Sequence, residues 1–174
     1  MIMKTVTIFL VAALSLLLSS CSPKVYSIRG EYNVTKYTET TSSYDEVWDK
    51  VIDFFAINNI SISTIEKSSG IIAANDVVIG KSNLSVEDKM GVIENRNAWF
   101  VMPYSSKNTK PVSVQCSLNV RVSEMKDGKV SITINIGNIM GKVITSNLAG
   151  LMIYPSSNFQ STGVFERTLL DMFK

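Results

Sequence analysis

The sequence of 174 residues contains no histidine, which excludes the chemistries that depend on an imidazole side chain. A Ser-His-Asp or Cys-His catalytic centre uses that side chain as a base, and many zinc sites use its nitrogen as a ligand. Acidic and basic residues are nearly balanced, with 17 Lys plus Arg against 15 Asp plus Glu, and the basic residues form no run. We therefore expect no enzyme, no metal or other cofactor, and no nucleic-acid partner.

The apolar segment near the N-terminus is too short to cross a membrane comfortably. Residues Val6 to Leu18 are apolar except for Thr7 and Ser15, and Lys4 precedes them. A helix that spans the hydrocarbon core of a bilayer needs about 20 such residues. A positive charge followed by a short apolar stretch is typical of a signal peptide, which we expect to occupy residues 1–20.

The segment Leu18-Ser19-Ser20-Cys21 follows and resembles the lipobox of bacterial lipoproteins at all four of its positions. The resemblance implies cleavage before Cys21 and acylation of that residue. Two or three acyl chains would hold the protein durably at a membrane, because each buried methylene contributes about 0.8 kcal/mol. Ser22 stands where an Asp would retain a lipoprotein in the inner membrane, so the resemblance implies the outer membrane, facing the periplasm. The alternative is an ordinary secretory signal with an unrelated cysteine after it.

If Cys21 is acylated, Cys116 has no disulfide partner within the chain. Exported proteins usually bury such a leftover thiol. Polar and apolar residues alternate from Val112 to Val120, and Cys116 falls on the apolar face. We expect a small core residue; the alternative is a reactive thiol, although no positive charge lies within three residues to stabilise a thiolate.

These observations divide the chain into three expected parts. Residues 1–20 are the expected signal peptide, and residues 21–28, with Pro23 early, are a lipidated tether. Residues 29–174 have the size of a single domain whose core needs neither disulfides nor a metal.

The clearest predicted helix extends from Tyr44 to about Asn58. Ser43 and Glu46 have the spacing of a capping box, which marks a helix N-terminus. Apolar residues then recur at helical spacing on one face, which we expect to be buried: Tyr44, Val47, Trp48, Val51, Ile52 and Phe55.

Alternation of polar and apolar residues predicts several strands. Residues 60–65 and 71–79 form a predicted hairpin, residues 92–102 a further strand, and residues 112–122 and 130–136 a second hairpin around an Asp127-Gly128 turn. A second helix is expected from Thr162 to Phe173, capped by Ser161 or Thr162. Strands that alternate need cover on one face only. The predicted fold is α+β, a curved antiparallel sheet of about five to seven strands with two main helices on one face.

Three segments resemble envelope lipoprotein domains of the BamC type and exported domains with folds like that of the TATA-binding protein. They are Ser43-Tyr44-Asp45-Glu46-Val47-Trp48, Ile60-Ser61-Ile62 and the stretch from Glu66 to Ile72. The resemblance covers roughly residues 40 to 80. It implies a helix with aromatic residues on its core face against a curved antiparallel sheet. It also implies a binding or scaffolding role, and it offers no catalytic residues to carry over.

Acidic residues gather in two places, and a solvated surface is expected at both. A cation site or a docking face is the alternative for the first group, and weak cation binding for the second. The groups are Asp45, Asp49 and Asp53 on the first helix, and Glu87, Asp88 and Glu94 in an expected long loop.

Two segments are candidates for a surface that binds a partner or a ligand. The first contains Arg96, Trp99 and Phe100, although Trp99 could equally pack in the core. The second, residues 137–155, is expected to be buried beneath the last helix; the alternative is an irregular strand and loop across the sheet edge that offers adaptable apolar groups to a partner. The candidates in it are Leu148, Leu151, Met152 and Tyr154.

The sequence therefore predicts a lipid-anchored, non-catalytic module of the cell envelope that binds or scaffolds an envelope protein. Such a module should expose an apolar patch near Trp99 or near residues 148–154. The alternative is a carrier of a small apolar ligand, which should enclose a cavity lined by Met and aromatic residues between sheet and helices.

Overall fold

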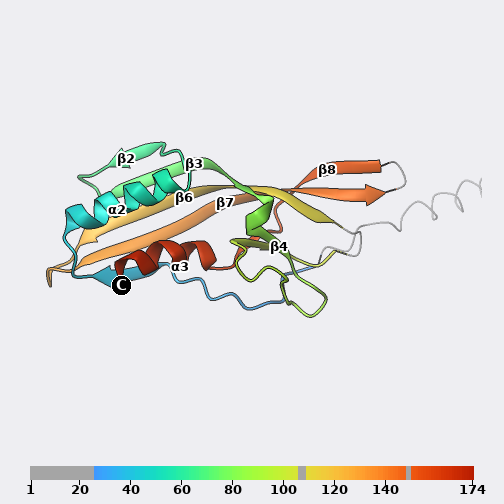
Figure 1. The fold of residues 1–174 in the computed structure, drawn as a ribbon, viewed down its shortest axis with the longest axis horizontal. Coiled ribbons are helices and arrows are strands. Elements are labelled where there is room, and N and C mark those ends of the chain that lie inside the picture. Colours follow the sequence, from blue (N-terminus) through green and yellow to red (C-terminus); the bar gives the residue numbers. More distant parts are fainter. Residues whose placement is uncertain (1–25, 106–108, 148–149) are drawn as a thin grey trace, which may run out of the picture.

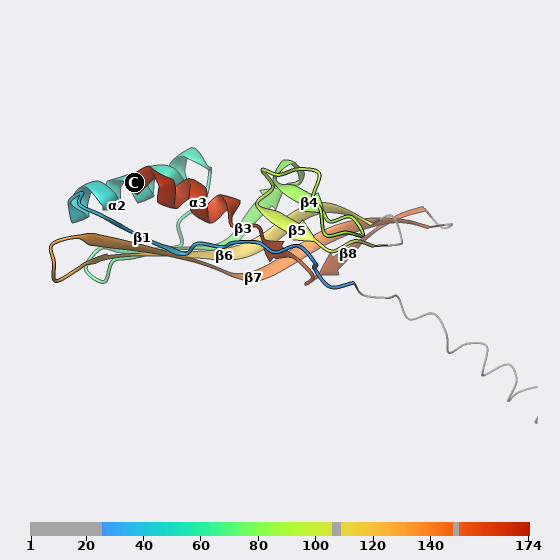
Figure 2. The same ribbon diagram turned by 90° about the horizontal axis from the view of Figure 1, so that it is seen from below.

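The computed structural model describes residues 26–105, 109–147 and 150–174. They form an α+β fold in which two helices cover one face of a six-stranded antiparallel sheet (Figures 1 and 2), so the predicted fold class is confirmed. The elements of this layer are β1 (Tyr37–Thr40), α2 (Tyr44–Ile57), β2 (Thr64–Glu66), β3 (Ile71–Gly80), β6 (Lys110–Glu124), β7 (Val130–Asn147), β8 (Gly150–Ser156) and α3 (Val164–Leu170). In the described part of the chain, no helix has the length and apolar character needed to cross a bilayer.

The sheet has the order β1-β7-β6-β3-β2, and β8 pairs with β7 on the same side as β1 but farther along the strand. Its centre is the long β6–β7 hairpin, which turns at Gly128 with a φ of 82°. The Met125 amide donates to the Lys129 carbonyl across this turn at 2.8 Å. The expected hairpin is confirmed, and both strands are longer than the alternating pattern predicts.

Helix α2 begins as its sequence predicts. Ser43 and Glu46 form the reciprocal capping box, with the Glu46 amide donating to Ser43 Oγ at 3.3 Å and the Ser43 amide donating to the Glu46 carboxylate at 3.0 Å. The helix buries most of the expected apolar residues and also Phe54, whereas Tyr44 and Ile52 are only half-buried. The acidic stripe on its other side is exposed, and Asp45 pairs with Lys67 at 2.9 Å.

The core fills the space between the helices and the sheet. The residues that point toward the helices from β6 and β7 are buried: Leu118, Val120, Val122, Ile132 and Ile134. The opposite face of these strands carries paired polar residues, such as Ser123 with Ser131 and Asn119 with Asn135. This clean alternation places one face of the sheet against the core and the other in solvent.

A small second sheet lies beside the helices on the same face (Figure 2), and the sequence analysis did not predict it. It contains β4 (Leu84–Val86), β5 (Phe100–Met102), which is parallel to β4, and β9 (Gln160–Ser161). A one-turn 3-10 helix, η1 (Lys81–Asn83), leads into β4.

The expected strand over residues 92–102 is therefore wrong for most of its length. The Asp88 carboxylate accepts hydrogen bonds from the amides of Met90 and Val92, and Gly91 has a φ of 85°. These local contacts hold the chain in a turn, which overrides the strand propensity of the residues that follow.

Two further element boundaries differ from the prediction. The first strand of the early hairpin is limited to Thr64–Glu66, because Ile60 packs in the core beside the end of α2. The last helix is shorter than expected and continues as a 3-10 turn, η2 (Asp171–Phe173). Its cap position is Gly163, with a φ of 79°, rather than Ser161 or Thr162.

Candidate binding surfaces

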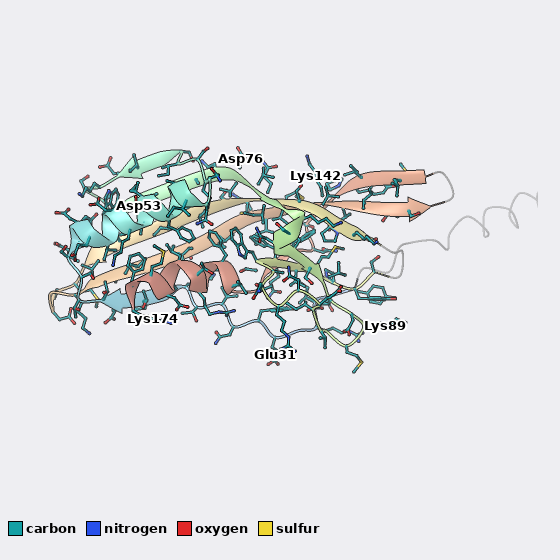
Figure 3. All side chains as sticks on the ribbon, in the orientation of Figure 1. Glu31, Asp53, Asp76, Lys89, Lys142 and Lys174 are labelled. Atoms are coloured by element: carbon teal, nitrogen blue, oxygen red, sulfur yellow. The ribbon has the colours of Figure 1, made fainter. Side chains whose placement is uncertain are left out.

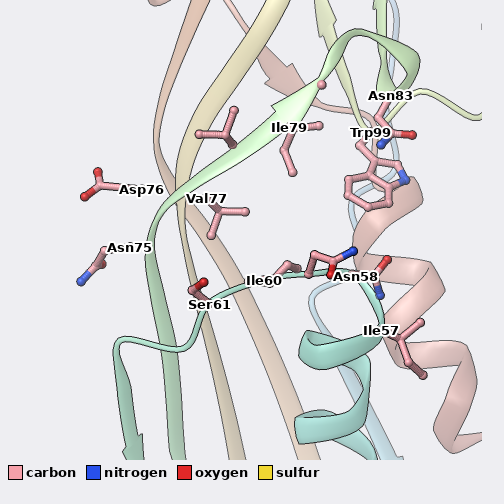
Figure 4. Close-up of a pocket in the computed structure, with 13 residues that line it drawn as sticks. Ile57, Asn58, Ile60, Ser61, Asn75, Asp76, Val77, Ile79, Asn83 and Trp99 are labelled. Atoms are coloured by element: carbon pink, nitrogen blue, oxygen red, sulfur yellow. The ribbon is translucent and has the colours of Figure 1, made fainter.

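A cleft of about 410 Å³ lies between the C-terminal end of α2, strand β3 and Trp99 (Figure 4). Ile60, Val77 and Ile79 form its apolar floor, and each is at least nine-tenths buried. The polar residues that line it are Asn58, Asn59, Ser61, Asn75, Asp76 and Asn83.

Two irregular backbone positions create this cleft. Asn59, with a φ of 53°, ends α2, and Asp76, with a φ of 56°, lies in a β-bulge of β3 between Ala74 and Val77. The bulge inserts an extra residue, so that β3 bends while Val77 returns to the core side of the sheet. Gln115 Nε2 donates to Asp76 Oδ1 at 2.8 Å and fixes the bulged residue.

Trp99 combines the two roles that its sequence context suggested. Its ring packs edge-on against Phe165 with centroids 4.6 Å apart, and the half-buried side chain also lines the cleft. The Trp99 amide donates to the Asn83 carbonyl at 2.7 Å, which attaches the loop before β5 to η1.

Arg96 is exposed and does not line the cleft. Phe100 is 1% exposed, so its expected place on a binding surface is wrong: it belongs to the core.

The cleft carries little charge. Among the residues that the structure describes, Asp76 is the one ionisable residue that lines it, and its carboxylate points away from Trp99 (Figure 4). Acid–base catalysis needs a titrating group within hydrogen-bond reach of the reacting atoms. An apolar floor with amide groups at its rim is instead suited to binding.

The second candidate surface is a projecting arm, made of residues 141–147 of β7 and residues 150–156 of β8 (Figure 1). Leu151 is 72% exposed and Ile153 is 60% exposed, and Met152 and Tyr154 are also exposed. Burial of this segment beneath the last helix is therefore wrong for the residues of β8, whereas Gly141 and Val143 of β7 are buried. Leu148 lies outside the residues that the structure describes.

A bulge in β7 makes the arm project. The strand has an extra residue between Gly137 and Met140 relative to β6, and Asn138 has a φ of 52°. Beyond the bulge, β8 continues the sheet edge as a regular strand. The sequence does not indicate this regularity, because Gly141 and Gly150 interrupt its apolar pattern.

Of the two cysteines, Cys21 lies outside the described residues and Cys116 is buried in the core, as predicted. Burial raises the pKa of the Cys116 thiol to about 11, and the nearby charge of Glu166 adds to this effect. The thiol is therefore protonated at neutral pH and is a poor nucleophile.

Glu87 is a residue whose role the sequence analysis missed. It was expected in a solvated loop, but it is 2% exposed and fastens the N-terminal segment to β4. Its carboxylate accepts hydrogen bonds from the amides of Arg29 and Gly30, both at 2.9 Å, and from the Tyr32 hydroxyl at 2.8 Å. Burial and the Glu87 carboxylate raise the pKa of Tyr32 well above its usual value. No local pattern marks Glu87, because these partners are 55 to 58 residues away.

The described chain begins against the body of the protein. The rings of Tyr26 and Tyr104 meet edge to face at 5.6 Å, and Lys89 Nζ lies 5.5 Å from the centre of the Tyr104 ring. Tyr26 and Ser27, which belong to the expected tether, thus line a pocket of about 290 Å³.

Among the described residues, no group of three or more Cys, Asp or Glu side chains is arranged to hold a metal ion.

No protein-family model matches the chain, and no curated protein matches it.

Proposed function

We propose that this protein is a lipid-anchored, non-catalytic module of the cell envelope that binds an envelope protein partner. Cys21 would carry the acyl chains and hold the mature chain at the outer membrane, facing the periplasm. The observation that carries the binding role is the weakly charged cleft beside Trp99, which has an apolar floor and an amide rim.

The cleft suits an extended segment of a partner. An apolar side chain of the partner would occupy the space above Ile60, Val77 and Ile79 and remove their remaining exposed surface from water. The side-chain amides of Asn59 and Asn83 would bond to the partner's backbone. BamC-type domains, which the sequence resembles, are implied to act as binding or scaffolding modules in the same way.

A carrier of a small apolar ligand is the second candidate, because a volume of about 410 Å³ is within the range of ligand pockets. The cleft, however, lies at the end of α2 rather than between the helices and the sheet. Among the described residues, Trp99 is the one aromatic residue that lines it, and no methionine does. Val47, Phe55 and Leu169 fill the space under the helices and have no exposed surface. These observations favour a protein partner.

The anchor makes the first prediction. Intact mass analysis of protein purified from its native host should show a chain that begins at Cys21 and carries acyl chains. The Cys21→Ala variant should move from the membrane fraction to the soluble exported fraction, because the acyl chains supply the durable membrane attachment. An unmodified thiol at Cys21, or a Cys21→Ala variant that still sediments with membranes, would contradict the proposed anchor.

The cleft makes the second prediction. Affinity capture with the acylated protein from detergent-solubilised membranes should recover one stoichiometric envelope protein. Ser61 is exposed at the cleft, so Ser61→Trp should fill the cleft without disturbing the core and should lower recovery by roughly tenfold or more.

The matched control is Lys50→Trp, which adds the same ring to the exposed face of α2 and should leave recovery unchanged. Equal recovery with both variants would exclude the cleft as the docking site. A small molecule that copurifies with the parent and is lost with Ser61→Trp would favour the carrier instead.

A further inference from the structure

The two faces of the arm differ in what they contact. Val143 points toward the core and is 6% exposed, whereas its neighbours Lys142 and Ile144 point to the opposite face. Ile144 pairs with Ile153, and Ser146 pairs with Leu151, so Leu151 and Ile153 join Ile144 on that outer face, whereas Met152 and Tyr154 lie on the face of Val143. The outer face of the arm thus presents a patch of aliphatic side chains to solvent.

This patch is densest on the arm, because the same face of the body exposes only scattered apolar side chains, such as Ile71 and Val78 of β3 and Met140 of β7. The same face of the central β6–β7 hairpin carries Ser, Thr, Asn and Arg side chains, as in the pairs Ser123 with Ser131 and Arg121 with Thr133. A surface that is polar over the centre of the sheet and aliphatic at its projecting end is typical of an interaction site. β8 is also an edge strand, because β7 is its one strand neighbour among the described residues.

Among the described residues of the arm and of the neighbouring end of β6, the charged side chains are those of lysines. Lys110 pairs with Ile144 across the β6–β7 ladder, so Lys110 and Lys142 flank the patch, and both are exposed. Neither lysine forms an ion pair within the described part of the chain. The sequence has no Asp or Glu from residue 95 to 123 or from residue 128 to 165. In Figure 3, Lys142 and Lys89 lie in the half of the molecule that contains the arm.

The arm and the start of the described chain lie at the same end of the molecule (Figures 1 and 2). Tyr26 is held there by its contact with Tyr104. Cys21 is five residues before Tyr26, and a fully extended chain of that length spans at most about 18 Å. An acyl chain on Cys21 would therefore bring the bilayer within that distance of this end of the protein.

We infer that the arm rests on the bilayer that holds the acyl chains, with Leu151, Ile153 and Ile144 in the lipid interface and Lys110 and Lys142 against anionic headgroups. The inference rests on the proposed anchor and adds a second contact to it. Aliphatic side chains flanked by lysines are the composition that binds an anionic membrane surface. A lipid anchor with a second contact also orients the body, so that the cleft is presented at a defined height above the membrane.

A probe on the arm tests this placement in vesicles that contain no other protein. The acylated chain carries Ile153→Cys labelled with an environment-sensitive fluorophore, in vesicles of phosphatidylethanolamine and phosphatidylglycerol. Cys116 is buried, so the introduced thiol is the one that reacts. The probe should emit at shorter wavelength than in solution, and nitroxide-labelled lipids should quench it.

Val78→Cys is the matched control, because Val78 is 67% exposed and pairs with the solvent-exposed Gln115 on the polar face of the sheet. Its probe should stay in water and should not be quenched. Equal emission from the two positions would overturn the inference. A probe on the arm that is shielded only in native membranes would also overturn it, because a protein would then cover the arm.

A second measurement separates the arm from the anchor. The Cys21→Ala chain should partition weakly onto phosphatidylglycerol vesicles, and Leu151→Gln with Ile153→Gln should lower the partition coefficient by roughly 30-fold. Val78→Gln should leave it unchanged. Loss of binding in the double variant supports the arm even if Cys21 proves unmodified, whereas equal partition of parent and double variant overturns the inference even if Cys21 is acylated.

Discussion

Glu87→Ala is expected to lower the free energy of unfolding by about 3–5 kcal/mol. The substitution removes a buried carboxylate that accepts three hydrogen bonds, from the amides of Arg29 and Gly30 and from the hydroxyl of Tyr32. These donors, which are partly buried, would be left without their carboxylate partner. Urea unfolding followed by circular dichroism measures the change.

Two variants define the cause of this loss. Glu87→Gln keeps the volume but offers one acceptor in place of two, and it should cost about 2 kcal/mol. Glu94→Ala removes an exposed carboxylate from the same loop and should change stability by less than about 0.5 kcal/mol. A cost below about 1 kcal/mol for Glu87→Ala would show that the three hydrogen bonds contribute little.

The same substitution bears on the proposed anchor. Residues 29–32 connect the tether to the body, and Glu87 is the side chain that fastens them to β4. In Glu87→Ala, a protease should cleave the chain near Arg29 at a protease concentration and digestion time that leave the parent protein intact. Acylated protein would then release its body from the membrane on cleavage.

Gly70→Ala should cost about 3–4 kcal/mol for two separate reasons. Gly70 has a φ of 70°, a left-handed conformation that strains any residue with a Cβ. A Cβ there would also lie 1.9 Å from the carbonyl oxygen of Val122, and that oxygen belongs to the backbone of a central strand. Because the Val122 amide donates to the Gly70 carbonyl at 2.8 Å, the turn cannot move away without losing this bond.

Gly128→Ala distinguishes the cost of backbone strain from the cost of steric overlap. Gly128 has a φ of 82°, but a Cβ at this position meets nothing within 4 Å. It should therefore cost only the conformational strain, about 1 kcal/mol. Thermal and urea unfolding of both variants give the comparison. Similar losses at Gly70 and Gly128 would show that the close approach to Val122 is relieved at little cost.

Elements with local signals were predictable from the sequence. Helix α2 follows from the Ser43–Glu46 capping box and its apolar face, and the β6–β7 hairpin follows from an Asp127-Gly128 turn between two alternating stretches. Both signals act between residues close in sequence. The α+β class also followed, because strands with one polar face require cover on the other face alone.

The binding surfaces could not be predicted from local sequence patterns, because they depend on contacts between residues far apart in the chain. Trp99 was correctly singled out, but its place beside the end of α2 depends on a bulge in β3 and on Phe165. The adjacent Phe100 looked equally suitable and is in the core, because β5 pairs with both β4 and β9. Glu87 was expected in a solvated loop, because its hydrogen-bond donors lie 55 to 58 residues earlier in the chain.

The sequence by itself determined the absence of imidazole chemistry, the alternation that makes a sheet with one wet face, and the cysteine that becomes the candidate acylation site. The tertiary structure decided which apolar residues are exposed. Leu151 and Ile153 are exposed, but the same apolar residues in the sequence would be equally consistent with burial under a helix. Their exposure depends on how far α3 and the small sheet extend over β7, and that distance is set by long-range packing rather than by any pattern within the strand.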